Sequence, residues 1–263
     1  MGPEAQPRVN EALAKWFHYW LDHDSPAASV PVAPVRYFVL GANTWAESMA
    51  WPPAEAESRE WFLQSTSRAN SSFGDGVLSA AGPHGPEDVF LYDPEFPFCA
   101  PGGNQAGIAN LGPHALSNSQ QENGVLVYTG PTVSAGLTIA GDALCVLHVR
   151  SSAPQTHFVA RLSVVGTDGA ARFLSLGASP AQADGPEGAV IVIKFDPIAF
   201  SVGPGEAIRL DVASSAFPLL VRSPNTTTDP ARVSTPAEFE RAVQIVYHDL
   251  DRPSRLILPV IAA

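Results

Sequence analysis

"ALCVLHVRSSAPQTHFVARLSVV", residues 143–165, consists of two apolar runs joined by a Ser-Ser-Ala-Pro-Gln turn. Val-rich runs bounded by Ser, Pro and Gly are typical of β-strands. In the first run Leu147 and Val149 alternate with His148 and Arg150, so the two pairs face opposite ways. The stretch therefore predicts two consecutive strands, the first with an apolar face and a polar face.

The same pattern continues in both directions along the chain. Short apolar runs separated by Gly, Pro and Asp recur at VRYFVLG (35–41), VLVYT (125–129), LTIAG (137–141), AVIVIKF (189–195), AIRLDVA (207–213), VQIVYH (243–248) and RLILPVI (255–261). Because no helical stretch lies between these runs, we expect an all-β protein folded as a jelly-roll β-sandwich.

Two stretches interrupt the strands. Residues 82–123 are rich in Gly, Pro, Asn and Gln, and we expect them to cross the surface as a long ordered loop. Residues 225–240 contain Ser234, Thr235 and Pro236, a sequence that is suited to opening one helical turn.

One helix is predicted before the strands. Residues from Val9 to His23 place Leu13, Trp16, Phe17, Trp20 and Leu21 on one face at helical spacing. A proline-rich stretch then ends the helix, because proline fixes φ and removes a backbone donor. We therefore divide the chain into a helix and hinge, residues 1–32, and a jelly-roll domain, residues 33–263. The aromatic face of the helix needs cover, from the sandwich, a second copy or another protein.

Composition excludes several classes of protein. The net charge of −11 disfavours nucleic acid and anionic membranes, which need clustered basic residues. No apolar run is long enough to span a membrane, and the N-terminus lacks signal-peptide features. Cys99 and Cys145 are too few for a disulfide framework or a zinc site. We expect a cytoplasmic protein without metal or cofactor.

The search for catalytic motifs yields no serine hydrolase signature. The nucleophile elbow of that class needs Gly-x-Ser-x-Gly, and the nearest string, GASPA at 177–181, lacks the second glycine. His-Glu-x-x-His and the phosphate-binding glycine loops are also absent from the sequence. We therefore expect the chain alone not to hydrolyse esters or peptides by the serine mechanism.

Two groups of residues remain as candidate sites. His148, Arg150 and His157 form one acid–base or anion-binding cluster if the next strand brings His157 to the same face; the alternative is a solvated sheet face. Trp45 and Trp51, with Glu47 between them, form a stacking platform for a sugar, or else cover one end of the sandwich or contact a neighbouring domain.

Blocks in the same order along the chain resemble a known family. These blocks are WFHYWLDH (16–23), VRYFVLGANTWAESMAWPP (35–53), the segment 67–103, LHVRSSAPQTHFVARLSVVGTDGAARFLSLG (147–177), GPGEAIRLDVASSAFPLLVRSPNT (203–226) and VYHDLDRPSRLILPVI (246–261). They resemble the C-terminal domain of the X-Pro dipeptidyl-peptidase and cocaine-esterase (CocE/NonD) hydrolase family. The resemblance implies a galactose-binding-like jelly roll that accompanies, without carrying, the catalytic Ser-Asp-His triad of an α/β-hydrolase domain.

Departures from the family pattern bear on the site. The resemblance places Leu147 and His148 at the edge of the acyl pocket of the esterases, where an aromatic residue usually occupies the position of His148. Thr156, His157 and Phe158 replace a Thr-Asp-Phe pattern, and GASPAQADGPEG (177–188) replaces an arginine-rich segment that packs on the hydrolase domain. These changes indicate a free-standing protein with its own ligand, or drift in a subunit that still docks.

Three functional hypotheses follow. In the first, the chain is a free-standing, non-catalytic homologue that binds a small molecule or a separate α/β-hydrolase subunit, or pairs with a second copy through Trp16, Phe17 and Trp20. In the second, it is a biosynthetic cyclase or isomerase that uses His148, Arg150 and His157 in a cleft. In the third, it is the C-terminal fragment of a serine hydrolase.

Overall fold

The computed structural model describes residues 9–21, 33–99, 115–116, 118–233 and 235–262. Its single described α-helix, α1, spans Val9–Leu21, and short 3-10 helices span Ser119–Gln121 (η2), Pro230–Arg232 (η3) and Pro236–Glu238 (η4). The described strands are β1 (Val35–Val39), β2 (Thr44–Ser48), β3 (Glu57–Gln64), β4 (Val77–Ser79), β5 (Asp88–Tyr92), β6 (Leu126–Thr132), β7 (Leu137–Gly141), β8 (Leu144–Ser151), β9 (Thr156–Val165), β10 (Ala171–Ala181), β11 (Ala189–Lys194), β12 (Ile198–Val202), β13 (Ala207–Ala213), β14 (Ala242–Tyr247) and β15 (Arg255–Ala262).

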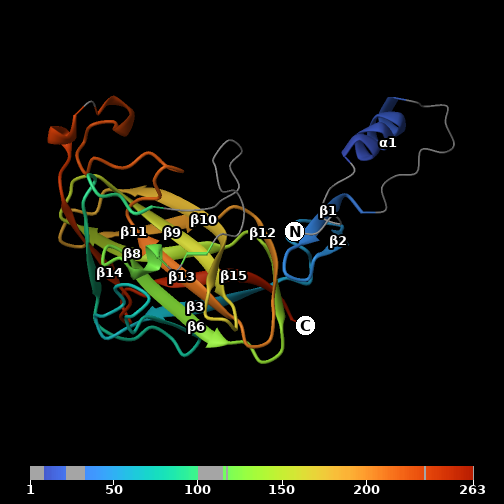
Figure 1. The fold of residues 1–263 in the computed structure, drawn as a ribbon, viewed down its shortest axis with the longest axis horizontal. Helices are drawn as coiled ribbons and strands as arrows, with labels where there is room; N and C mark the ends of the chain where they lie inside the picture. Colours follow the sequence, from blue (N-terminus) through green and yellow to red (C-terminus); the bar gives the residue numbers. More distant parts are fainter. Residues whose placement is uncertain (1–8, 22–32, 100–114, 117, 234, 263) are drawn as a thin grey trace.

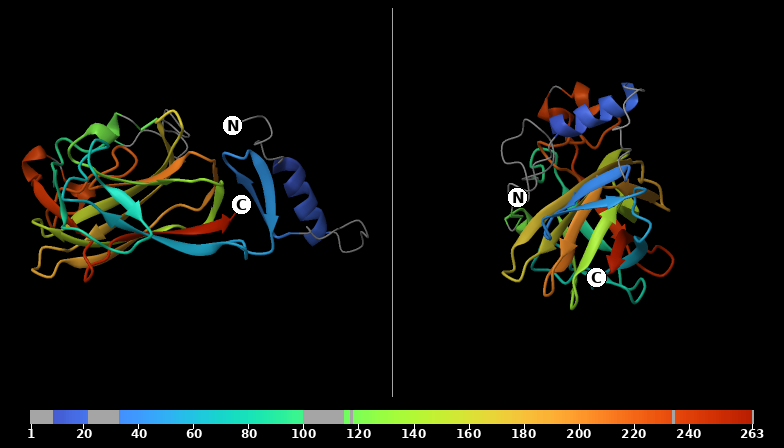
Figure 2. Two further views of the ribbon diagram at one scale, coloured as in Figure 1. Left: turned by 90° about the horizontal axis from the view of Figure 1, so that it is seen from below. Right: turned by 90° about the vertical axis from the view of Figure 1, so that its right-hand side faces the viewer.

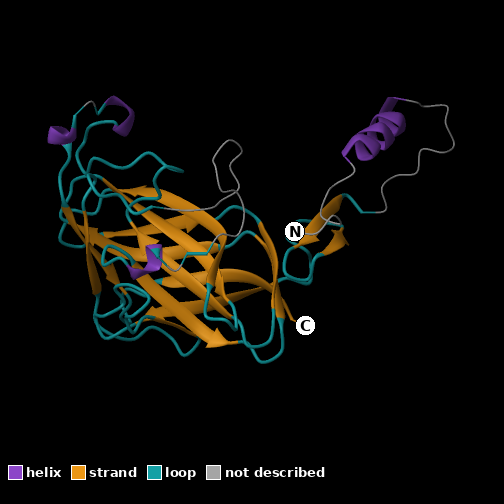
Figure 3. Cartoon of the chain, in the orientation of Figure 1, coloured by secondary structure: helices purple, strands orange, loops and turns teal. Residues whose placement is uncertain are grey.

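The strands form a two-layered sandwich, which confirms the predicted jelly roll (Figure 1, Figure 3). One layer runs β10-β9-β13-β6, and the other contains β5-β14-β8 with β11 on the far edge of β8. β15 pairs with β8 next to β14, and it also pairs with β3. β3 in turn pairs with β4, and β4 pairs with β6 of the first layer. Every strand pair is antiparallel except β4 with β6, which meet at a single parallel pair, Val77 and Thr129.

The core lies between the layers, and β8 and β9 contribute to it from opposite sides. Leu147 and Val149 of β8 point inward, as do Phe158 and Leu162 of β9, and none is more than 1% exposed. The Phe158 ring meets the Phe90 ring edge-on, with centroids 6.4 Å apart. The alternation predicted for residues 147–150 is therefore confirmed, because Leu147 and Val149 belong to the core whereas Arg150 is exposed.

A small β-hairpin adjoins one end of the sandwich. β1 pairs with β2 in a sheet of their own, so the run predicted at 35–41 does not join the two main layers. The hairpin is attached at Leu40, whose N–H donates to Ala199 O (3.0 Å) and whose carbonyl accepts from Ser201 N (2.8 Å). Helix α1 lies beyond this hairpin, apart from the sandwich (Figures 1 and 2). No residue of α1 is buried.

The two interruptions have more structure than the sequence indicated. The stretch 82–123 was expected to be a surface loop throughout, and this is wrong for β5, which alternates buried and exposed residues and pairs with β14. Residues 100–114 and 117 lie outside the described part. The helical turn at 234–236 is confirmed by η4, where Thr235 N donates to Glu238 Oε1 (3.1 Å) in a capping box; Ser234 itself is not described.

Replacement of Phe158 by alanine should lower the free energy of unfolding by about 3–5 kcal/mol, since it removes a ring from a packed core. The matched control is Phe73→Ala, because Phe73 is 75% exposed and its loss opens no cavity. Urea unfolding followed by tryptophan fluorescence measures both. Equal losses of stability in the two variants would contradict the placement of the core.

Candidate functional site

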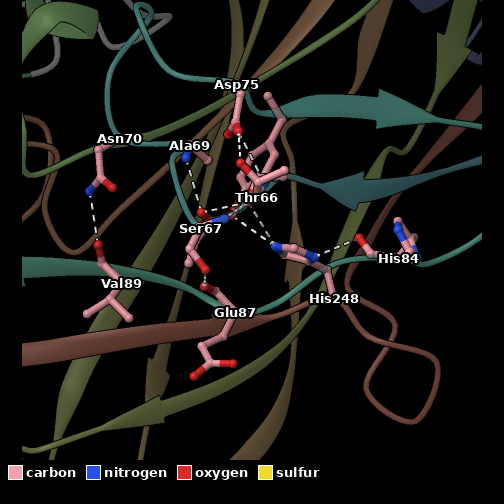
Figure 4. A network of polar contacts seen from close by, with 12 residues as sticks. Thr66, Ser67, Ala69, Asn70, Asp75, His84, Glu87, Val89 and His248 are labelled. Carbon is pink, nitrogen blue, oxygen red and sulfur yellow. Dashed lines mark hydrogen bonds and ion pairs between the residues drawn. The ribbon is translucent and has the colours of Figure 1, made fainter.

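A buried carboxylate, Asp88, is the centre of a polar network inside the sandwich (Figure 4). It accepts hydrogen bonds from the Ser65 hydroxyl (2.8 and 2.7 Å), the Tyr128 hydroxyl (2.8 Å) and the Ala69 N–H (3.1 Å). His248 Nε2 lies 2.9 Å from Asp88 Oδ2, in a fully buried ion pair. These donors come from the ends of β3 and β14, from β6 and from the loop after β3.

His248 is held from its other side as well. Its Nδ1 lies 3.1 Å from the carbonyl oxygen of His84, so each ring nitrogen faces an oxygen atom. Figure 4 shows the ring between His84 and the part of the network that carries Thr66 and Ala69. Nearby, Ser67 Oγ donates to Glu87 O (2.8 Å) and Asn70 Nδ2 to Val89 O (2.9 Å), which fixes the loop 66–70 against β5.

Ser65, His248 and Asp88 are the residue types of a serine hydrolase triad, but their order in space is different. A triad places histidine between the serine and the acid, so that the imidazole takes the hydroxyl proton. Here the Ser65 hydroxyl donates its hydrogen bonds to the carboxylate of Asp88 at 2.8 and 2.7 Å, whereas His248 Nε2 lies 3.4 Å from Ser65 Oγ and closer, at 2.9 Å, to Asp88. Ser65 is also only 8% exposed. The arrangement is therefore a structural hub that joins four segments of the chain.

The pKa of Asp88 reflects two opposing effects. Burial alone would raise it, but hydrogen bonds from His248, Ser65, Ala69 and Tyr128 together outweigh burial and hold the pKa below its ordinary value. Burial, and next the charge of Asp88, raises the pKa of the Tyr128 hydroxyl. Both groups therefore keep one protonation state at neutral pH, the carboxylate charged and the phenol neutral.

A second buried ion pair lies on the outer side of the β9–β13 layer. Arg161 Nη2 is 2.6 Å from Asp211 Oδ2, and the amide of Gln120 donates to the same carboxylate at 2.9 Å. The guanidinium stacks on the Phe98 ring, 4.6 Å from its centroid. Arg209 Nη1 donates to Gln120 Oε1 (2.9 Å), which links the pair to β13. These contacts fasten η2 and the segment around Phe98 onto the sheet.

The predicted cluster of His148, Arg150 and His157 is not assembled. Leu147 and Phe158 both point into the core from opposite layers. Their neighbours His148 and His157 consequently point outward on opposite sides of the sandwich. The sequence could not distinguish one shared face from two, because it does not state which layer each strand joins. His148 and Arg150 do share the outer face of β8, as predicted.

The surroundings of His148 differ from those expected. Its pKa is lowered by burial and next by Arg255, with Arg252 acting in the same direction and Asp249 opposing them. The positive charges that lower this pKa belong to Arg252 and Arg255, which follow β14, and Arg150 on the same strand is not among them. On the same face the adjacent β11 exposes Val190 and Val192, by 60% and 56%. His148 thus lies on an open, partly apolar sheet face.

Leu147, Trp45, Trp51 and Glu47 were predicted to contact a ligand. Leu147 is fully buried in the core and has no surface to offer. Trp45 packs on Phe38 on the face of the hairpin that also carries Arg36 and Glu47. Trp51 packs on Tyr37, which lies on the opposite face. The two tryptophans therefore form no shared stacking platform.

Two of the hollows on the described surface lie near residues discussed above. One, of about 410 Å³, lies along β5, beside Val89, Leu91, Asn123 and Val243. The other, of about 380 Å³, lies at the start of β9 and contains His157. His148 and Arg150 line neither of them.

Sequence reasoning missed the network around Asp88, although one signal was present. Asp88 is the first residue of DVFLY, in which Phe90 and Tyr92 are the other inward positions. A carboxylate that alternates along a strand with the same period as two buried aromatic residues indicates a buried charge, which requires partners. Its partners Ser65, Tyr128 and His248 are distant in sequence, and only the fold reveals them.

The fold and the buried network together define a β-sandwich domain with a polar centre. The chain belongs to the family described as the X-Pro dipeptidyl-peptidase C-terminal non-catalytic domain, whose profile matches residues 31–257. It is 30% identical over 245 residues to the cocaine esterase of Rhodococcus sp. (strain MB1 Bresler), an alignment that covers 88% of this chain and 42% of the esterase. The family resemblance expected from the sequence is confirmed.

Solved structures share the fold. An aminopeptidase from a marine sediment Thaumarchaeota archaeon superimposes with a TM-score of 0.80 at 18% identity, over 96% of this chain and 44% of the other. An α-amino acid ester hydrolase superimposes with a TM-score of 0.78 at 21% identity, over 94% of this chain and 44% of the other. A CocE/NonD family hydrolase from Staphylococcus aureus superimposes with a TM-score of 0.64 at 14% identity, over 97% of this chain and 46% of the other. The chain thus spans less than half the length of each of these relatives. Among the described residues, no helix has the length and apolarity of a membrane span.

Asp88→Asn should lower the free energy of unfolding at pH 7 by about 3 kcal/mol, because the amide cannot accept all the hydrogen bonds that the buried donors make to the carboxylate. Asp88 titrates near 3.8 when unfolded and lower when folded. Its contribution is therefore complete above about pH 5 and is lost as the pH falls through the folded pKa. The difference in the free energy of unfolding between the parent protein and the variant should become smaller in acid, as measured by urea unfolding at several pH values. Asp251→Asn, on an exposed turn, is the control. A stability difference between parent and Asp88→Asn that does not depend on pH would contradict the lowered pKa of Asp88.

Arg255→Gln should raise the pKa of His148, since Arg255 is the charged group that lowers it most. Arg150→Gln should leave it nearly unchanged, because Arg150 is not among the groups that shift it. A ¹H–¹³C NMR titration of the His148 ring measures both, and in the parent protein its midpoint should lie below 6.5. A larger change in the pKa of His148 in the Arg150 variant than in the Arg255 variant would contradict our description of the surroundings of His148.

Proposed function

We propose that the chain acts as the non-catalytic β-sandwich unit of an acyl or peptide hydrolase and binds an α/β-hydrolase unit through the aromatic face of α1. The observation that carries this proposal is the uncovered face itself. Trp16, Phe17 and Trp20 are 52%, 50% and 56% exposed. Their rings touch one another, with centroids 5.1 Å apart for Trp16 and Phe17 and 6.3 Å for Trp16 and Trp20.

The energetics favour a covered state for this helix. Burying a large apolar side chain contributes roughly 1.5–3 kcal/mol, so three adjacent aromatics can support a specific interface. The sandwich does not supply the cover, since no residue of α1 is buried. Packing of these rings on the chain's own sandwich was one of our expectations, and it is wrong for the described structure.

The relatives support the choice of partner. The family is named for a non-catalytic domain, and the similar proteins carry the names esterase, aminopeptidase and ester hydrolase. This chain spans 42–46% of their lengths, so the unit that does the chemistry in them has no counterpart in the matched part. The hypothesis of a cyclase or isomerase loses its basis, because His157 does not join His148 and Arg150.

A photo-crosslinking amino acid at Phe17 should capture a protein that contains Gly-x-Ser-x-Gly when the chain is expressed in its source organism. The same group at Lys15, which lies on the other side of α1 and pairs with Glu11 (3.1 Å), is the matched control and should capture much less. Mass spectrometry of the adducts identifies the partner.

The crosslinking experiment also tests the alternatives. The purified complex should hydrolyse an aryl ester such as p-nitrophenyl acetate, whereas the isolated chain should not, because it lacks a nucleophile elbow. Adducts that contain only a second copy of this chain would replace the proposal with a homodimer through Trp16, Phe17 and Trp20. Equal capture from Lys15 and Phe17 would remove the helix as the docking element.

A further inference from the structure

The hollow that contains His157 lies at the opposite side of the sandwich from His148. It is formed by the start of β9, the end of β10 and the segment 223–230, and its volume is about 380 Å³. We call it the His157 cavity. Its polar side chains include Gln155, His157, Gln182, Thr226 and Thr228, and three prolines complete the wall. A volume of this size is within the range of small-molecule sites in proteins.

The wall of the His157 cavity is fixed by buried hydrogen bonds. Thr156 Oγ1 donates to Asn225 Oδ1 (2.8 Å), and Asn225 Nδ2 donates to Glu240 O (2.6 Å). Asn225 itself is fully buried and has a left-handed backbone with φ of 63°. Tyr92 OH donates to Ser223 O (3.1 Å) and attaches the same segment to β5. A ligand would therefore meet a preformed wall, without the cost of ordering a loop.

The chemistry of the lining is neutral and polar. None of the described lining residues carries a permanent charge. Burial lowers the pKa of His157, so at neutral pH its imidazole is uncharged and offers one donor and one acceptor. In the described part of the chain the His157 ring has no hydrogen-bond or ion-pair partner, so both nitrogens are available to a ligand.

A buried amide, that of Gln244, lies behind the wall of the cavity. Gln244 is fully buried, and its Nε2 donates to Thr156 Oγ1 (2.7 Å). Its Oε1 has no hydrogen-bond partner among the described residues. Gln244 is not among the lining residues of the cavity, so it holds Thr156 in place from behind the wall and takes no direct part in ligand binding.

We propose that the His157 cavity binds a small neutral molecule rich in hydroxyl or amide groups. Hydroxyl and amide groups match the amide, hydroxyl and imidazole groups of the lining, both as donors and as acceptors. A charged ligand would lose hydration on entry without meeting an opposite charge. A neutral saccharide and a capped dipeptide both present this chemistry. The site is independent of the docking proposed for α1, since it involves neither that helix nor a catalytic unit.

Isothermal titration calorimetry and saturation-transfer NMR on the whole chain test the proposal with two neutral probes. These are maltose, and a dipeptide of alanine with an acetylated N-terminus and an amidated C-terminus; glucuronate and glucosamine serve as charged counterparts. We expect at least one neutral probe to bind and both charged probes to bind at least about fivefold more weakly. Binding of maltose alone or of the dipeptide alone identifies the source of the shared chemistry.

Three variants locate the site. His157→Phe keeps an aromatic ring but removes both nitrogens, and Thr228→Val removes a hydroxyl with little change of shape; each should weaken binding about fivefold, the effect of one lost hydrogen bond. Thr227→Val is the matched control, because the exposed Thr227 lies next to the cavity residues without lining the cavity. Thr228 is on a surface segment, so its variant remains informative if His157→Phe unfolds.

Three results would overturn the proposal. The first is that neither neutral probe binds at concentrations up to about 20 mM, beyond which affinity is too weak to indicate a built site. The second is that glucuronate or glucosamine binds as tightly as the neutral probes. The third is that Thr227→Val weakens binding as much as Thr228→Val does.

Discussion

The charged carboxylate of Asp88 is the constraint on which the sandwich depends. Removing a carboxylate from water costs several kcal/mol, and only well-placed donors offset that cost. Asp88 receives them from Ser65, Tyr128, Ala69 and His248, which belong to segments far apart in the sequence. The ends of β3 and β14, the middle of β6 and the start of β5 must therefore all be in register for the charge to be tolerated. A misfolded pairing of any of these strands would leave a buried charge without partners.

The second ion pair has a similar role on the outer side of the other layer. Arg161 and Asp211 lie opposite each other on β9 and β13, and η2 is fastened to them through Ser119 and Gln120. Replacing both charges by apolar residues is often neutral for stability, whereas removing one is costly. We therefore understand this pair as an anchor that specifies where the segment around Phe98 and η2 packs, more than as a source of net stability.

The interior of the sandwich and its peripheral surfaces differ in how their polar and apolar groups are used. In the described interior, Asp88 contacts His248 and Arg161 contacts Asp211, and the Ser65 hydroxyl donates to Asp88. The surfaces with unused capacity are at the periphery: the aromatic face of α1 at one end, and the His157 cavity where β9 begins. Our two proposals, a docked partner and a bound neutral molecule, rest on these two peripheral surfaces.

The sequence by itself determined the local directions of side chains. Alternation in β8 identified Leu147 and Val149 as inward residues, and helical spacing identified the aromatic face of α1, because both periods are properties of the local backbone. It also sufficed to recognise the family. Only the tertiary structure decided which strands meet. His148 and His157 are nine residues apart and both point outward, yet they lie on opposite faces because β8 and β9 join different layers. Asp88 and His248 are 160 residues apart and in contact. Periodicity describes a strand relative to its own axis, whereas a site requires the positions of several strands relative to one another.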